Sequence, residues 1–222
     1  MARLPRLVLA GQAHLVRLGT LDGRAACADA EDRARLLDAL RQALAAERVQ
    51  LHAYALLEQE LRLLVTPARP QALARFVQAI GRRYVRGYNR RHGRSGTLWD
   101  GRFRACAVEP GECLLDAMSW IEQGAEGLSS AAHHVGAGRD VLITDAPAYW
   151  QLGNTPFERE AAWRQRLAQG LGSDTVARLG SALFGGWAYG RAAFVEAVAT
   201  PGRPAAPRPR GRPRRTAGRG AA

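Results

Sequence analysis

The stretch that most constrains the fold is the segment 50–67, which reads QLHAYALLEQELRLLVTP. Two apolar runs, at 51–57 and 61–65, flank the polar residues 58–60. Apolar runs of this length on either side of a short polar turn predict a β-hairpin. A hairpin needs at least a third strand or a packed helix to be stable, so we expect the rest of the chain to build on this pair.

The second strand of this hairpin carries charge on an otherwise apolar segment. Because side chains alternate between the two faces of a strand, Leu61, Leu63 and Val65 should share one face of the sheet. Glu60 and Arg62 should share the other face. We therefore expect the Glu60 carboxylate and the Arg62 guanidinium to form an ion pair near the start of the strand.

Hydrophobic periodicity predicts the other elements of the fold. The best helix is 70–91, where apolar residues recur every three or four positions. The full set is a strand at 8–18, a helix at 29–47, the hairpin at 50–66, the helix at 70–91, a strand at 102–108 and a helix from 110 to 123. This order, β-α-β-β-α-β-α, predicts an α+β fold: a ferredoxin-like antiparallel sheet with helices on one face.

Composition divides the chain into three predicted parts. Residues 1–150 form the sheet domain, with an irregular segment before residue 150. Residues 151–200 form a small helical region, which a capping box at Thr155 and Glu158 opens. Residues 201–222 are rich in Pro, Gly, Ala and Arg, and we expect them to be disordered.

Cysteine content and hydropathy indicate a protein of the cytoplasm. The three cysteines, Cys27, Cys106 and Cys113, are odd in number and lack CxxC spacing, which predicts free thiols and no cysteine-based zinc site. No signal peptide and no apolar run near 18 residues is visible, so we expect a soluble protein without a membrane partner.

The charge balance favours a nucleic-acid partner. The formal net charge is +12, and every basic residue is arginine. An arginine bias in the encoding genome is the alternative explanation of this charge. The arginines cluster, however, which favours a DNA partner and association with the nucleoid in the cytoplasm. One cluster lies along and beyond the 70–91 helix: Arg75, Arg82, Arg83, Arg86, Arg90, Arg91, Arg94, Arg102 and Arg104. Such a surface could follow a phosphate backbone while nearby aromatic rings stack on unpaired bases, although a merely solvated helix face remains the alternative.

A second basic cluster lies in the tail. Residues 209–215, PRGRPRR, resemble an AT-hook, in which a flat Arg-Gly-Arg-Pro core enters a narrow minor groove. An unspecific basic tail explains the same residues equally well. The candidate contacts are Arg210, Arg212, Arg214 and Arg215.

Several motifs together resemble the single-tyrosine HUH transposases, in the branch of REP-associated tyrosine transposases. The hairpin has that family's frame, in which a His-hydrophobic-His triplet leads into an apolar strand that ends in Thr-Pro. Residues 81–103, which contain Gly-Arg-Arg-Tyr and Arg-Ser-Gly-Thr-Leu-Trp, are similar to its second helix and following loop. Further similarity covers its third helix at 114–128 and the short motifs at 133–136, 149–153 and 155–159.

The resemblance implies a reaction and also implies that this chain lacks the groups for it. In the family, two strand histidines and a polar helix residue hold Mg²⁺ or Mn²⁺, and a tyrosine attacks the scissile phosphate of single-stranded DNA. The histidine positions are Glu60 and Arg62, the tyrosine position is Trp120, and the helical ligand position is Gly124. Arginine has no lone pair for a metal, and tryptophan has no nucleophilic oxygen. We therefore expect no metal cofactor.

Three functions remain open from the sequence. The first is a degenerate transposase-family protein, monomeric or homodimeric, that binds hairpin or single-stranded DNA without cutting it. The second is an active nicking and joining enzyme with a remodelled site in which Glu60 is a ligand. The third is a domesticated or decaying scaffold with no retained role.

Other candidate site residues have structural interpretations. We interpret His133 and His134 as a loop motif, since adjacent side chains diverge on a helix or a strand. Tyr84 and Tyr88 are expected in the core, and His52 is expected to make structural hydrogen bonds.

Overall fold

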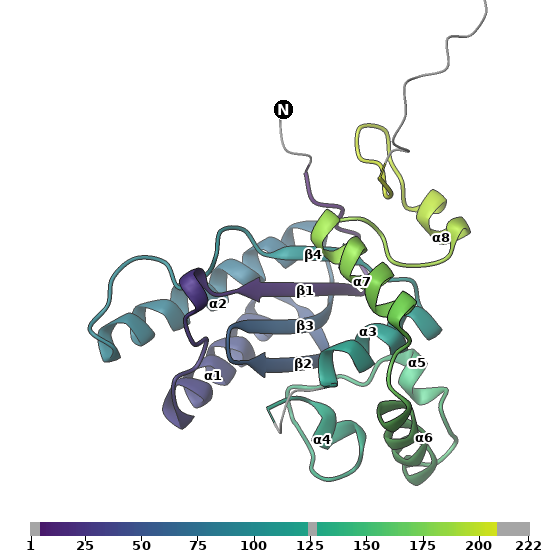
Figure 1. Cartoon of the computed structure of the whole chain (residues 1–222), viewed down its shortest axis with the longest axis horizontal. Helices are drawn as coiled ribbons and strands as arrows, with labels where there is room; N and C mark the ends of the chain where they lie inside the picture. Colours follow the sequence, from purple (N-terminus) through teal and green to yellow (C-terminus); the bar gives the residue numbers. More distant parts are fainter. Residues whose placement is uncertain (1–4, 124–127, 208–222) are drawn as a thin grey trace, which may run out of the picture.

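The computed structural model describes residues 5–123 and 128–207, and its centre is a four-stranded antiparallel sheet (Figure 1). The strands lie in the order β2-β3-β1-β4. The connections from β1 to β2 and from β3 to β4 therefore each pass over one intervening strand, as in a ferredoxin-like fold. Their bounds are β1 His14–Gly19, β2 Val49–Leu57, β3 Glu60–Pro67 and β4 Arg104–Ala107. The predicted α+β fold and its element order up to the third helix are confirmed.

The hairpin forms as the sequence predicts. β2 and β3 pair in antiparallel register, from Val49 opposite Pro67 to Leu57 opposite Glu60, with an irregularity between Leu51 and Ala53. The β1 strand is shorter than predicted. Gly11 lies in a turn with φ +70°, a conformation that ends an extended run.

Two long helices cover one face of the sheet, behind the strands in Figure 1. α1 spans Ala30–Glu47, and the Asp29 side chain caps it by accepting from the Asp32 amide at 2.8 Å. α2 spans Pro70–Arg91, as predicted. The predicted apolar face of α2 is buried in the core with Leu61, Leu63 and Val65: Leu73, Phe76, Val77, Ile80, Tyr84 and Tyr88.

The opposite face of the sheet is covered too, which corrects the expectation of helices on one face only. α3 (Glu112–Glu122) packs there in a second core with Leu15 and Leu64, and so do α5, α6 and α7 (Figure 1). These helices span Pro147–Trp150, Pro156–Gln169 and Ser173–Gly185. The chain reverses after β4 at Pro110 and Gly111, where glycine adopts φ +80°.

The remaining elements are short. They are the 3-10 helix η1 (Leu21–Gly23), α4 (Ala131–His134) and α8 (Ala192–Ala197). The predicted capping box at the start of α6 is present, with Thr155 and Glu158 bonding reciprocally. The segment before residue 150, predicted to be irregular, contains α4 and α5.

The start of the predicted tail packs against the body. Ala205 is 1% exposed, and its carbonyl accepts from the Ala188 amide at 2.8 Å. The AT-hook-like segment 209–215 lies outside the described residues. The three cysteines are free thiols, as predicted. Within residues 5–123 and 128–207, no helix combines the length and hydropathy needed to span a lipid bilayer.

His14 predicts a pH dependence of stability. Its side chain is fully buried in β1, where desolvation lowers its pKa from 6.5 to about 4, against the raising effect of its bond to the Gln12 carbonyl. Nε2 accepts the Leu9 amide at 3.2 Å, so a second ring proton has no place there. A lowered folded-state pKa means that the unfolded chain binds the proton first as pH falls below 6.5. Stability is therefore lost on acidification.

We expect His14 to remove about 2 kcal/mol of unfolding free energy between pH 7 and pH 5. Urea unfolding of the protein and of a His14→Gln variant at both pH values measures this contribution. The variant should lose less stability on acidification than the protein. Equal losses in the two proteins would contradict the assignment, since His52, whose pKa burial also lowers, is present in both.

Candidate functional site

Glu60 and Arg62 meet on the sheet face that carries α3, and a second arginine joins them. Arg62 donates through Nε to Glu60 Oε1, which confirms the predicted pairing. Arg17 on β1 lies directly opposite Arg62 in the register and donates through Nε to Glu60 Oε2. One carboxylate thus bridges two guanidinium groups. Sequence reasoning missed Arg17, although a lone arginine within the apolar strand at 14–19 was a visible signal.

Trp120, which lies on α3, also contacts this group of side chains. The Arg62 guanidinium carbon lies 3.9 Å from the centroid of the Trp120 ring, a cation–π contact. Arg62 Nη1 also donates to the Trp120 carbonyl at 3.2 Å. The structure therefore brings together three of the four positions that the sequence singled out. Gly124, the fourth, lies outside the described residues. We call Arg17, Glu60, Arg62 and Trp120 the arginine–tryptophan cluster.

The cluster is partly shielded from solvent. The side chains of Arg17, Glu60 and Arg62 are 28%, 12% and 20% exposed, and Trp120 is half-buried against the second core. Both oxygens of Glu60 already accept a guanidinium, and neither arginine has a lone pair to donate to a metal. Chemically, the group is an ion-pair network in which one carboxylate offsets one of two guanidinium groups, so one positive charge remains.

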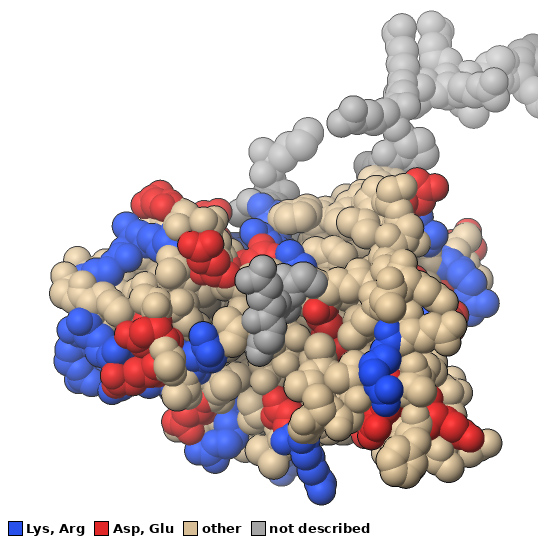
Figure 2. All heavy atoms as spheres, turned by 60° about the horizontal axis from the view of Figure 1, so that its bottom comes forward, with Lys and Arg blue, Asp and Glu red and all other residues tan. Residues whose placement is uncertain are grey.

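The predicted arginine stripe is exposed on the outside of α2. Arg75, Arg82, Arg86 and Arg90 are all exposed, on the side of the helix away from its buried face. A shallow groove of about 660 Å³ runs beside them and is lined by Arg82, Arg86, Arg90, Arg94, Asn89 and Trp99, among others. Figure 2 shows basic side chains gathered at the left end of the molecule, where α2 ends in Figure 1, with acidic side chains beside them.

Trp99 is the aromatic component of this groove. Its indole Nε1 is buried and has no hydrogen-bond partner among the described residues. Gly81 faces it across the groove wall, where a Cβ would lie 3.9 Å from Nε1. The Trp99 ring is partly buried against the first core and lines the groove beside Arg82, Arg86, Arg90 and Arg94.

Some of the predicted DNA contacts are already engaged within the protein. Arg91 pairs with the carboxylates of Asp29, Glu31 and Asp32, and so ties the end of α2 to the start of α1. Arg83 donates to Gln42 at 3.1 Å, and Arg104 donates to the Phe184 carbonyl at 3.3 Å. No ion pair within the described residues engages Arg75, Arg82, Arg86, Arg90, Arg94 or Arg102.

The structural interpretations of His52, Tyr84 and Tyr88 are confirmed. The ring of His52 bonds to the Thr144 carbonyl and the Thr66 hydroxyl at 2.7 and 2.9 Å. The Tyr84 and Tyr88 hydroxyls donate to backbone carbonyls of the segment before α1. Neither tyrosine is near the arginine–tryptophan cluster as a substitute nucleophile, because both lie on the opposite face of the sheet in the first core.

Two solved structures are similar to this chain. One is a REP-associated tyrosine transposase bound to a REP hairpin, at 12% identity over 67% of this chain and 93% of the other, with a TM-score of 0.49. The second was assigned as a transposase in Deinococcus radiodurans R1, at 20% identity over 50% of this chain and 88% of the other, with a TM-score of 0.36. No protein-family model and no curated protein matches the sequence.

Proposed function

We propose that the protein is a DNA-binding member of the single-tyrosine HUH transposase family that has lost the cleavage reaction. The observation that carries this proposal is the arginine–tryptophan cluster. The sequence resemblance assigns Glu60 and Arg62 to the metal-ligand positions and Trp120 to the nucleophile position. In the fold Arg62 contacts both Glu60 and Trp120, which supports the proposal that these positions belong to one site.

Electrostatics argues against a divalent metal at this position. Two guanidinium groups bind the only carboxylate of the cluster, so a dication would have to displace one arginine and lie beside the other. A dication and a guanidinium in contact repel each other by several kcal/mol at the effective dielectric constant of a protein surface. Without the metal and without a tyrosine oxygen, neither phosphate activation nor a covalent DNA link is available.

The DNA partner is proposed from the groove beside α2. Its arginines supply charge for phosphates, and Trp99 supplies a ring for an unpaired base. This arrangement suits single-stranded or hairpin DNA, whose bases are open to stacking. The tail arginines could extend the contact, and their contribution remains a prediction, as do the oligomeric state and association with the nucleoid.

Charge reversal of Arg82 and Arg86 should weaken DNA binding strongly. Loss of two phosphate contacts on single-stranded DNA makes the log–log salt slope shallower by about 1.4 and lowers affinity roughly 10- to 30-fold at 0.1 M salt. Fluorescence anisotropy with a labelled hairpin oligonucleotide at several salt concentrations measures both quantities. Because phosphate contacts carry no sequence information, the loss should be similar for all hairpin sequences.

A matched control separates position from net charge. Arg139→Glu with Arg164→Glu changes the net charge by the same amount on exposed residues outside α2. We expect this control to bind DNA within about threefold of the unmodified protein. At 0.1 M salt, screening largely removes interactions between exposed charges that lie more than about 10 Å apart. Equal losses in the two double variants would contradict a binding surface on α2.

A further inference from the structure

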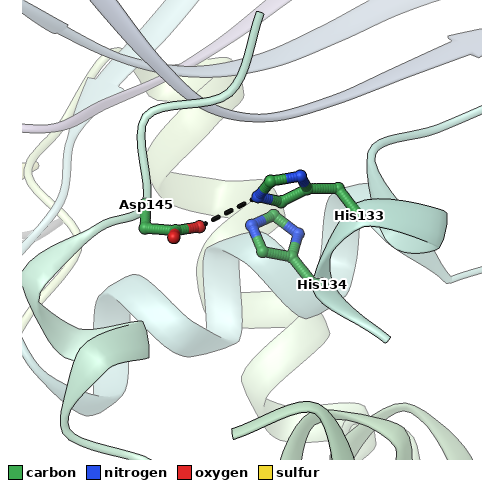
Figure 3. Close-up of side chains that lie close together, drawn as sticks. All are labelled: His133, His134 and Asp145. Carbon is green, nitrogen blue, oxygen red and sulfur yellow. Dashed lines mark hydrogen bonds and ion pairs between the residues drawn. The ribbon is translucent and has the colours of Figure 1, made fainter. Parts of the chain in front are cut away.

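Two histidines and one aspartate outside the proposed DNA surface converge on one point. His133 and His134 end α4, and Asp145 lies just before α5 (Figure 3). One possible ligand atom from each residue lies within 4.8 Å of the other two. The sequence interpretation as a loop motif with diverging rings is wrong here, because the rings meet edge-on with centroids 5.1 Å apart.

His134 is held as a metal ligand would be. Its side chain is fully buried, and Nδ1 lies 2.6 Å from Glu122 Oε1. A carboxylate only accepts, so Nδ1 carries the proton and Nε2 of the neutral ring has a free lone pair. Metal-bound histidines are commonly oriented by such a bond from the remote ring nitrogen to a carboxylate. Glu122 is itself fixed by the Trp163 indole N–H at 2.8 Å.

The free nitrogen of His134 has nothing to bind within the described residues. Nε2 is buried and is without a hydrogen-bond partner there. In Figure 3 this ring nitrogen faces the carboxylate of Asp145 and the near edge of the His133 ring. Buried polar atoms nearly always have a hydrogen-bond partner. A buried, unpaired nitrogen that points at two other ligand atoms is therefore expected to bind an ion or a water.

The other two groups give the site a path to solvent. The side chains of His133 and Asp145 are 16% and 24% exposed, and His133 Nε2 lies 3.1 Å from Asp145 Oδ1. His133 Nδ1 accepts the Asp140 amide at 3.1 Å. Coordination through Nε2 therefore requires the ring proton to move to Nδ1, with loss of the Asp140 bond.

We propose that His133, His134 and Asp145 form a binding site for a zinc-type divalent cation, with water completing its coordination. Two imidazoles and one carboxylate suit Zn²⁺ and its first-row neighbours, whereas Mg²⁺ prefers oxygen ligands alone. The bound ion links α4 to the segment that leads into α5, on the side of the sheet away from the α2 groove. The proposal is independent of the proposed function.

A second cluster in the protein shows what an unsuitable site looks like. Asp29, Asp32 and His92 also place ligand atoms within 4.8 Å of one another. Arg91 already supplies the cation there, bonding to both carboxylates, and His92 Nε2 bonds to Asp32 at 2.7 Å. No buried side-chain nitrogen of this cluster lacks a hydrogen-bond partner among the described residues, so the cluster provides the matched control.

The test titrates Zn²⁺ into the full chain, prepared without a histidine tag and stripped with a chelator. Isothermal titration should show one equivalent bound, and the thermal midpoint should rise with Zn²⁺ but not with the same concentration of Mg²⁺. Asp145→Asn and His133→Gln should each lower Zn²⁺ affinity at least about tenfold. These partly exposed positions are chosen because replacement of the buried His134 could unfold the protein.

Controls and a spectroscopic probe make the outcome decisive. His92→Gln should leave Zn²⁺ affinity unchanged. Co²⁺ in place of Zn²⁺ should give visible d–d bands without the near-ultraviolet thiolate band, since no cysteine belongs to the site. Failure to bind Zn²⁺ at all, binding that is insensitive to Asp145→Asn, or a thiolate band would each overturn the proposal.

Discussion

Five substitutions made together should give a covalent protein–DNA product where the unmodified chain gives none. They are Arg17→Gln, Glu60→His, Arg62→His, Trp120→Tyr and Gly124→Asn. The product is expected with single-stranded hairpin DNA and Mg²⁺ or Mn²⁺, and it should survive denaturation. A labelled oligonucleotide on a denaturing gel detects the band. The difference is all or nothing, because the unmodified chain is proposed to lack both nucleophile and metal.

The physical reason lies in the arginine–tryptophan cluster. Replacing Glu60 and Arg62 by histidine supplies two imidazole ligands, and tyrosine at 120 supplies the attacking oxygen. Arg17 must change as well, since it pairs with Glu60 and would become an unpaired cation beside the new metal. The exchange should not unfold the protein, because partly exposed ion pairs contribute only roughly 0–1 kcal/mol.

Two matched proteins control this experiment. Trp120→Tyr alone should form no product, since it has a nucleophile without a metal. The same four changes without Arg17→Gln should form much less product, because the remaining guanidinium competes with the dication. A covalent band from the unmodified protein in the presence of metal would contradict the proposed loss of cleavage and favour the alternative of an active, remodelled site.

Glu122→Ala should destabilise the fold by about 3–5 kcal/mol, as removal of one partner from a buried charged network does. The Glu122 side chain is fully buried. It accepts from the Ser130 hydroxyl at 2.5 Å, from His134 at 2.6 Å and from the Trp163 indole at 2.8 Å. Alanine leaves these three buried donors without an acceptor and opens a cavity between α3, α4 and α6.

Urea unfolding in the presence of a chelator measures this effect without any contribution from bound metal. Glu112→Ala is the matched control, since it removes the same side chain from the same helix. Glu112 is 77% exposed and pairs with Arg166 at 2.9 Å, so its loss should change stability by no more than about 1 kcal/mol. Similar midpoints for the two variants would show that the buried network contributes little.

Local sequence patterns were sufficient to predict the elements that fold on their own periodicity. Alternation along 60–65 correctly placed Leu61 and Leu63 on one face and the charged pair on the other. The spacing in 70–91 predicted both bounds of α2 and its buried face. These predictions succeed because the period of a strand or helix relates residues that are close in sequence.

The second face of the sheet was predicted less well. Leu63, Leu64 and Val65 form a continuous apolar run, which is typical of a strand that is buried on both faces. The run does not say which helices cover the second face. It is the tertiary structure that places α3, which follows the turn at Gly111, on the side opposite α1 and α2.

The sequence by itself determined the hairpin, the order of elements up to the third helix and the exposed arginines of α2. The assignment of four positions to a metal site and a nucleophile came from the family resemblance and stays a prediction. Only the tertiary structure decided which side chains meet. Arg17 reaches Glu60 from 43 residues away through strand pairing. Glu122 on α3 and Trp163 on α6 fix His134 beside His133 and Asp145, which come from two other segments. Contacts of this kind depend on the packing of distant segments, which no local period encodes.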